Sequence, residues 1–233
     1  DCQRILNDLS NAEASVSLGG IKASGHLRVS APGGFGRQHV APLVHDFVRE
    51  HPEVTVSLDL SDRVVDLLNE NMDCAVRIGV LPDSSLVGVK LADNQRLVVA
   101  TPTYLQRHGS PQHPLELAKH NCLNLVSSGA PSGWLFTING EATPIRVSGS
   151  LACNDGSSIL DWALNNAGLA WRSRWEVQQY LRSGSLVTVL DDFIAPPNAI
   201  YAVFPQRKHL PLRVRLWIDF LKHRYSIESY WNT

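Results

Sequence analysis

The first eighty residues alternate between two hydrophobic periods. Every second residue of His26–Ala31 is apolar, which predicts a strand. The next segment is apolar at helical spacing and predicts a helix that ends before His51-Pro52. We expect a strand at 54–60, a short helix at 62–68 and a strand at 74–78 to follow. The order strand, helix, strand, helix, strand indicates a parallel sheet with crossover helices.

The middle of the chain has the pattern of a second α/β unit. Strands are predicted at 87–91, 97–100, 122–126, 145–153, 169–171, 186–190 and 199–204, and helices at 158–166, 175–181 and 212–225. A final strand and helix that return to the first unit would give two lobes joined by two crossing segments. We therefore expect a helix end and linker at 1–20, lobe I at 21–100, lobe II at 101–201, and the return to lobe I at 202–233.

Composition and charge narrow the class of protein. Hydrophobic residues make up 44% of the 233 residues and charged residues 18%, as expected for a globular protein with a sizeable core. The formal net charge of -1 argues against nucleic-acid binding by this segment alone, because phosphate binding needs a basic face. No apolar run approaches the roughly 20 residues that span a bilayer. With no secretion signal at the start, the cytoplasm is the expected location.

Three strand-to-helix turns are candidate binding sites. Gly33-Gly34-Phe35-Gly36 follows the first strand, where ligands bind in open α/β sheets and where a helix start suits a carboxylate or phosphate. The turn lacks the lysine of a P-loop, and a glycine-rich turn without a ligand is the alternative. Ser61-Asp62 and Asn154-Asp155-Gly156 stand at similar turns, where plain helix capping is the alternative.

The residue patterns of catalytic and metal sites are missing. The nine histidines form no H-E-x-x-H motif, the four cysteines no C-x-x-C pair, and no G-x-S-x-G elbow occurs. We therefore expect no metal site, no cofactor and no enzymatic activity. Tryptophans more often pack in the core or at its rim than bind a ligand. Trp171, beside Arg172 at the end of a short strand, is the tryptophan that we consider as a candidate to face a cleft.

Several stretches resemble the effector-binding domain of LysR-type transcriptional regulators. The segments SDRVVDLL, CAVRIG and LPDSSL are similar to one large subfamily, and the resemblance extends over about the whole chain. It implies two Rossmann-like lobes of the periplasmic-binding-protein-like (type 2) fold, with a small-molecule effector, an organic anion, between them. It also implies a dimer, a tetramer in the full-length parent, and promoter DNA bound by an N-terminal winged helix-turn-helix missing from this sequence.

The resemblance carries over a set of effector-binding positions. In lobe I these are Ser30, Ala31, Pro32, Gly33, Phe35, Gly36, Ser61 and Asp62. The first crossing strand and lobe II supply Ala100, Thr101, Pro102, Ser127, Ser128, Asn154, Asp155, Trp171 and Arg172. The second crossing segment supplies Val203 and Phe204.

One departure from the family pattern concerns charge. Many members have an apolar residue and a proline where this chain has Arg172 and Ser173. Arg172 is able to form a bidentate pair with an effector carboxylate, and a structural ion pair, for example with Asp155, is the alternative. The alternatives to a regulator's sensor domain are a periplasmic solute receptor of a transporter, which has the same fold, and a two-lobed α/β enzyme.

Overall fold

The chain forms two compact units, each with its own five-stranded sheet, which confirms the predicted α/β class. The computed structural model describes residues 22–63, 65–79, 86–126, 133–206 and 210–232. Unit 1 contains the described residues up to Ala92 and from Ile200 onward, and unit 2 contains Asp93–Ala199. The first passage between the units lies at residue 92 and not after residue 100, because β5 (Arg96–Ala100) hydrogen-bonds to two strands of unit 2.

The sheet of unit 1 has the strand order β2-β1-β3-β12-β4. Its strands are β1 (Gly25–Ala31), β2 (Val54–Leu60), β3 (Cys74–Ile78), β4 (Leu86–Asn94) and β12 (Asn198–Pro205). β1 pairs in parallel with β2 and β3, while β12 runs antiparallel to β3. The three strands predicted in the first eighty residues are therefore confirmed, and their carboxyl ends lie at one edge.

A helical segment leaves this edge directly after β1. It runs without a break through α2 (Gly33–Phe35), a π-helical turn η1 (Gly36–Val40) and α3 (Ala41–Glu50). Pro42 has no N–H for the carbonyl group four residues before it, and the wider π-helical turn lies immediately before α3. The predicted helix is confirmed, with this turn as a local irregularity.

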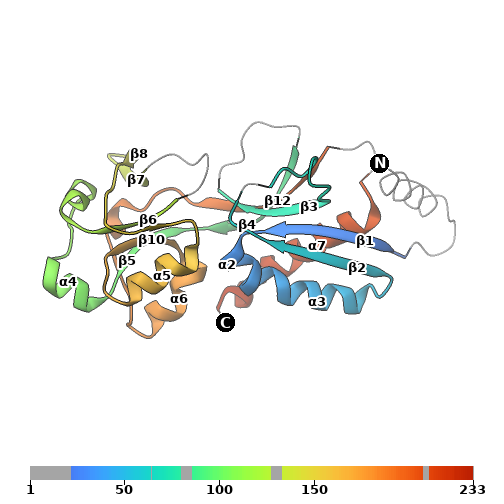
Figure 1. Ribbon diagram of the computed structural model, residues 1–233, viewed down its shortest axis with the longest axis horizontal. Helices are drawn as coiled ribbons and strands as arrows, with labels where there is room; N and C mark the ends of the chain where they lie inside the picture. Colours follow the sequence, from blue (N-terminus) through green and yellow to red (C-terminus); the bar gives the residue numbers. More distant parts are fainter. Residues whose placement is uncertain (1–21, 64, 80–85, 127–132, 207–209, 233) are drawn as a thin grey trace. The chain divides into compact units, whose positions relative to one another are not determined.

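The core of unit 1 lies between its sheet and two helices. Figure 1 shows α3 and the long helix α7 (Leu212–Ser226) beside β1 and β2, in agreement with their contacts. Phe47 of α3 and Trp217 of α7 are fully buried and meet edge to face, with ring centroids 5.2 Å apart. Leu27 and Val29 of β1 are also fully buried, as the alternation of the strand predicts.

The helix predicted at 62–68 is wrong. The described part of this segment consists of bends and turns, in which Asp66 Oδ1 accepts hydrogen bonds from the backbone N–H groups of Leu68 and Asn69, both at 3.1 Å. An aspartate that binds nearby backbone donors competes with helix formation. Val65 and Leu67 are buried while Leu68 is exposed. The segment therefore lies across the sheet as irregular chain and buries alternate residues.

Unit 2 has a sheet of order β11-β5-β10-β6-β9 and a separate hairpin. The new strands are β6 (Cys122–Leu125), β9 (Ala152–Cys153), β10 (Leu169–Ser173), β11 (Val187–Val189) and the hairpin β7 (Trp134–Ile138) and β8 (Glu141–Ile145). The single strand predicted at 145–153 is wrong, because β8 ends where it was expected to begin. Asn139 and Gly140 both have positive φ and make the two-residue turn of the hairpin. Asn-Gly is a common sequence of such turns, so this hairpin could have been predicted.

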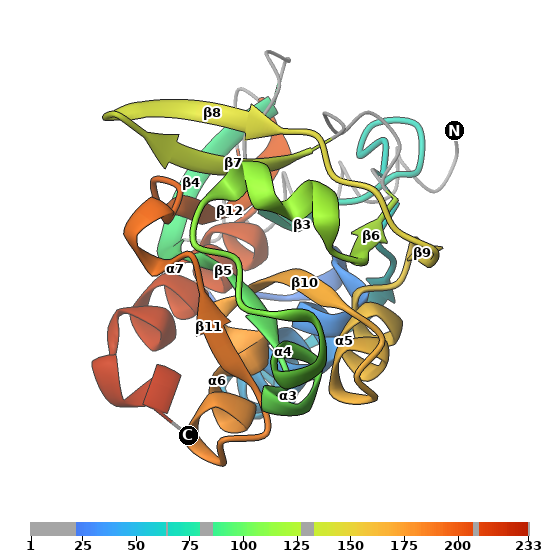
Figure 2. The same ribbon diagram turned by 90° about the vertical axis from the view of Figure 1, so that its left-hand side faces the viewer.

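Two apolar clusters cover the two faces of the unit 2 sheet. On one face Trp134 and Phe136 of the hairpin pack with Val98, and on the other Ile159 and Val177 pack with Val99. Ile159 belongs to α5 (Gly156–Leu164) and Val177 to α6 (Arg174–Arg182). Figure 2 shows the hairpin and these two helices on opposite sides of the sheet. The remaining helices are α4 (Pro102–His108) and the 3-10 turns η2 (Pro114–Lys119), η3 (Asp191–Phe193) and η4 (Glu228–Asn232), of which η4 belongs to unit 1.

Candidate functional site

The carboxyl end of β1 places a buried hydroxyl at the edge of the unit 1 sheet. Ser30 is 3% exposed, and its side chain makes no hydrogen bond to another residue that the structure describes. Its register partners are Asp59 in β2 and Ala75 in β3. The Ser30 hydroxyl, which none of the described residues uses, therefore has hydrogen-bonding capacity for a bound molecule.

The glycine-rich turn after β1 is closed by a side chain of the protein itself. The backbone N–H of Gly33 donates to Asp62 Oδ1 at 2.8 Å. Asp62 therefore stands where an anionic ligand was expected at this helix start. Gly36 is required for packing, because a Cβ there would lie 2.2 Å from Leu60 Cδ2. Ala31 and Phe35 are buried beside this turn, and Pro32 accepts a hydrogen bond from the Gly36 N–H at 2.6 Å.

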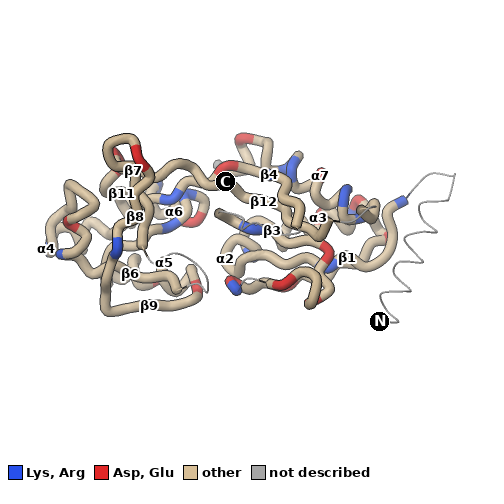
Figure 3. The backbone as a smooth tube through the Cα atoms, turned by 90° about the horizontal axis from the view of Figure 1, so that it is seen from above, with Lys and Arg blue, Asp and Glu red and all other residues tan. Residues whose placement is uncertain are grey.

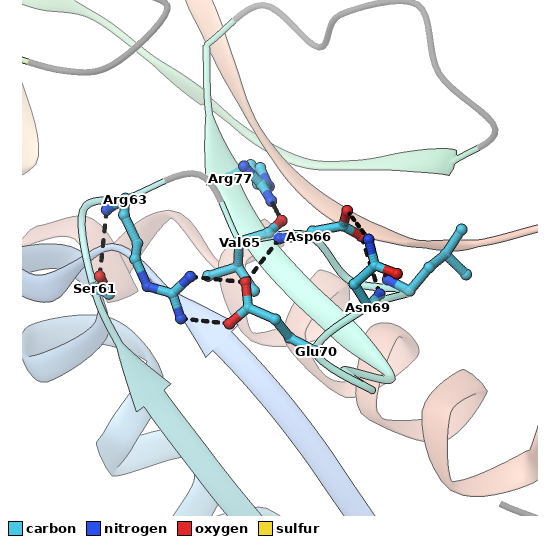
Figure 4. A network of polar contacts seen from close by, with 8 residues as sticks. Ser61, Arg63, Val65, Asp66, Asn69, Glu70 and Arg77 are labelled. Atoms are coloured by element: carbon cyan, nitrogen blue, oxygen red, sulfur yellow. Dashed lines mark hydrogen bonds and ion pairs between the residues drawn. The ribbon is translucent and has the colours of Figure 1, made fainter. Parts of the chain in front are cut away.

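The loop after β2 contains a polar network (Figure 4). Ser61 Oγ accepts from the Arg63 N–H at 3.3 Å, and the exposed Arg63 guanidinium forms a two-pronged ion pair with Glu70. The pairing lowers the pKa of the Glu70 carboxyl. Arg77 of β3 donates from Nη2 to the Val65 carbonyl oxygen and takes no part in the Arg63–Glu70 pair.

Sequence reasoning missed Arg77. It is half-buried in an otherwise apolar strand, and burial lowers the pKa of its guanidinium. An arginine inside the run CAVRIG is the signal that could have drawn attention to it. Val203 and Phe204, by contrast, are core residues that are 2% and 8% exposed, and Val203 packs with Val65 and Ala75.

In unit 2, Asn154 and Asp155 precede helix α5. Asp155 is its N-cap and accepts from the Ser158 N–H at 2.7 Å, as the capping alternative predicts, while Asn154 is exposed. The other predicted residues of this loop region, Ser127 and Ser128, lie outside the described residues.

Arg172 is held in a buried ion pair. It is 8% exposed, and its Nε and Nη2 donate to Glu176 Oε2 and Oε1, both at 2.8 Å. The guanidinium lies against the first turn of α5, where a Cβ on Gly156 would be 2.2 Å from Nη2. Arg172 therefore forms a structural ion pair, the alternative to binding an effector carboxylate, and its partner is Glu176 and not Asp155.

Trp171 packs on the opposite face of β10 from Arg172. The Arg96 guanidinium stacks over its ring, 4.6 Å from the centroid. Burial, together with the charge of Arg172, lowers the pKa of Arg96 to about 10. Trp171 is thus a packing partner of Arg96 at the end of the sheet where β10 ends and β5 begins.

The residues predicted from the first crossing strand lie at the other edge of this sheet. Ala100 and Thr101 follow the end of β5, which is antiparallel to β10, so they lie near the start of β10. Thr101 caps α4 and donates to Asn166 Oδ1 at 2.6 Å, and Pro102 is the first residue of α4. The structure does not bring these three residues together with Asn154, Asp155, Trp171 or Arg172.

Metal ligands, reactive thiols and membrane-spanning helices are three further signs of function that the described parts of the chain could carry. No group of three His, Cys, Asp or Glu side chains in those ranges is arranged to hold a metal ion. Cys74 and Cys122 are buried thiols, and burial raises the pKa of each to about 12. None of the described helices is long and apolar enough to cross a membrane. Figure 3 shows acidic and basic positions interspersed along each unit, without a continuous basic stripe.

Comparison with known proteins identifies the family. The LysR substrate binding domain matches residues 21–226. The chain is 35% identical over 231 residues to the HTH-type transcriptional regulator DmlR of Escherichia coli K12, an alignment that covers 99% of this chain and 75% of DmlR. It is 34% identical over 221 residues to the transcriptional activator TtdR of the same strain, covering 94% of this chain and 68% of TtdR.

Solved structures agree. CrgA, a LysR-type transcriptional regulator from Neisseria meningitidis, matches with a TM-score of 0.78 at 28% identity, covering 97% of this chain and 76% of CrgA. The full-length virulence activator AphB of Vibrio cholerae matches with a TM-score of 0.74 at 28% identity, covering 95% of this chain and 76% of AphB. These matches confirm the periplasmic-binding-protein-like type 2 fold, and the chain belongs to the LysR substrate-binding domain family.

Proposed function

We propose that this chain is the sensor domain of a transcriptional regulator and that its effector is a small organic acid. The observation that carries the proposal is the hydroxyl of Ser30 at the carboxyl edge of the unit 1 sheet, which has no hydrogen-bonding partner among the described residues. Ligands of open α/β folds bind at this edge. The relatives that match over nearly the whole chain are transcriptional regulators, which favours this function over an enzyme or a solute receptor of a transporter.

Regulation by the effector depends on the coupling between effector binding and the conformation of the domain. An effector changes the conformational equilibrium of the domain only as far as its affinity differs between the two states. In the parent protein, an oligomer in the cytoplasm, the shift would change how the DNA-binding parts meet their half-sites on promoter DNA. The near-neutral charge of this chain fits a domain that leaves DNA contact to another part of the protein.

Thermal unfolding of the 233-residue chain with a broad library of small carboxylic acids tests the proposal. The library would include propionate, lactate, succinate, benzoate and salicylate, each beside its neutral amide. We expect at least one acid, and not its amide, to raise the midpoint, and Ser30→Ala to reduce that rise. Stabilisation by none of the acids would contradict the proposed effector class. Equal stabilisation of Ser30→Ala and the wild type would contradict the role of Ser30.

A further inference from the structure

Three side chains with hydrogen-bond donors share one face of the unit 1 sheet near its carboxyl edge. Ser30 in β1 pairs in register with Ala75 in β3, and Arg77 lies two residues further along β3. Tyr201 in β12 is the register partner of Arg77. Because side chains alternate along a strand, Ser30, Arg77 and Tyr201 point to the same face. The Cα atoms of Ser30 and Arg77 are separated by one strand spacing and one pleat repeat, on the order of 8 Å.

This face is opposite to the one that α3 and α7 cover. Ala31 and Leu60 point towards the helical segment after β1, since a Cβ on Gly36 would touch both of them. Ser30, the neighbour of Ala31, therefore points away from the helices. On its side the sheet is covered by Val65 and Leu67, which pack on Ala75 and Val203, with Tyr201 half-buried at the margin. Arg77 thus lies at the edge of an apolar cover and not inside the helical core.

The charge of Arg77 has no carboxylate partner among the described residues. Its guanidinium has one hydrogen bond, from Nη2 to the neutral Val65 carbonyl, so most of its five N–H donors are not used by the described residues. Two buried arginines of the described chain are paired, Arg172 with Glu176 and Arg213 with Asp73, while Arg96 stacks on the Trp171 ring. A half-buried guanidinium without an acid is costly, and a bound carboxylate would balance its charge.

The hydroxyl groups of Ser30 and Tyr201, on the same face as Arg77, also have hydrogen-bonding capacity for a bound molecule. Neither the Ser30 hydroxyl nor the Tyr201 hydroxyl makes a side-chain hydrogen bond within the described ranges. Asp59 in β2 is the register partner of Ser30. The acidic side chains of the loop after β2 are bonded to other groups: Asp62 to the Gly33 N–H, Asp66 to backbone N–H groups and Glu70 to Arg63. The strand order β2-β1-β3-β12 places Asp59 two strands from Arg77 and three strands from Tyr201. An acid whose carboxylate binds at β3 and β12 would therefore keep its charge away from Asp59.

We propose that Arg77 binds the carboxylate of the effector, with the hydroxyl groups of Ser30 and Tyr201 as additional donors. The inference rests on the proposed function and deepens it, because it names the residue that recognises the acid. It replaces two candidates from the sequence: Arg172, which Glu176 neutralises, and the helix start at Gly33, which Asp62 closes. The ligand class is a small organic carboxylate, recognised by a planar two-pronged contact that lysine does not reproduce.

Calorimetric titration with the library acid that most stabilises the wild-type chain tests this assignment. We expect Arg77→Gln to weaken binding of that acid on the order of 10- to 100-fold, and Arg77→Lys by a smaller factor, because charge-assisted pairs are among the strong hydrogen bonds. Tyr201→Phe should weaken it several-fold. Arg63→Gln is the matched control, since Arg63 is an exposed arginine in the neighbouring loop, and it should leave binding within twofold.

The binding measurements distinguish a wrong assignment of Arg77 from a wrong effector class. If an acid binds the wild type and both Arg77 variants bind it within twofold of the wild-type affinity, the Arg77 assignment is wrong while the sensor function stands. If no acid of the library binds the wild type, the proposed effector class fails and the Arg77 assignment fails with it. If Arg77→Gln does not fold, Arg77→Lys decides, because lysine keeps a charged donor for the Val65 carbonyl. Circular dichroism of each variant establishes whether it is folded.

Discussion

Arg172 in unit 2 and Arg77 in unit 1 occupy matching places in their strands but differ in their surroundings. Each is the fourth residue of a five-residue strand that runs parallel to a neighbour. Arg172 is 8% exposed and forms a two-pronged ion pair with Glu176, four residues ahead on α6. Arg77 is half-buried and bonded to one backbone carbonyl group. Arg172 is therefore held as part of the structure, whereas Arg77, whose charge none of the described acids balances, is a candidate binding residue.

The largest expected effect concerns the pair in unit 2. Glu176→Gln would leave the buried Arg172 charge without its acid, which costs about 3–5 kcal/mol of unfolding free energy. Urea unfolding measures this loss. Glu70→Gln is the control, because Glu70 forms the same kind of two-pronged pair with Arg63 at the surface, and it should change stability little. Equal losses for the two variants would contradict the structural role given to Arg172.

The second prediction concerns the loss of stability in acid caused by the half-buried His39 of unit 1. Burial lowers the pKa of His39 from 6.5 to about 4. The unfolded chain therefore binds a proton before the folded chain does, so the stability is fully present above pH 6.5 and falls as the pH drops towards 4. The loss is on the order of 2–3 kcal/mol. His39→Gln should flatten this part of the stability profile, whereas the exposed His45→Gln should not. An unchanged profile in His39→Gln would show that another group causes the acid sensitivity.

The first helical glycines of the two units give the third prediction. A Cβ on Gly156 would be 2.2 Å from Arg172 Nη2, so Gly156→Ala should displace the ion pair and cost about 1–3 kcal/mol. On Gly33 the nearest atom would be 3.7 Å away, which is ordinary contact, so Gly33→Ala should be neutral or slightly stabilising. Thermal midpoints of the two variants measure the difference. A larger loss in Gly33→Ala would reverse the comparison.

The smallest effect on stability is expected at Arg77. Arg77→Gln removes one hydrogen bond to the Val65 carbonyl but also relieves the burial of an unbalanced charge, so the net loss is at most about 1 kcal/mol, far less than that expected for Glu176→Gln. The contrast between a small stability cost and a large loss of acid binding is what distinguishes a binding residue from a structural one. A stability loss as large as that of Glu176→Gln would make Arg77 a structural residue.

The sequence predicted the first strands and the first helix well, because β1, β2 and α3 have an alternating or helical apolar pattern and β3 is a short, mostly apolar run. It failed at 62–68, where Asp66 side-chain hydrogen bonds replace a helix, and at 145–153, where the Asn139-Gly140 turn was overlooked. The site was predicted only in part. Ser30 and the glycine turn follow from their place after a strand, but the Asp62 cap on Gly33 and the choice of Glu176 by Arg172 join residues far from a local pattern. Such partners are set by tertiary packing.

The most direct test of whether Arg77, and not Arg172, binds the acid follows both arginines in one sample. Nitrogen-15 NMR of the arginine side chains, assigned with Arg77→Lys and Arg172→Lys, would follow a titration of the wild-type chain with the acid that stabilises it most. We expect the Arg77 Nε–H signal to shift with the acid concentration and the Arg172 Nε–H signal, bonded to Glu176, to stay in place. A shift at Arg172 with none at Arg77 would contradict the assignment of Arg77.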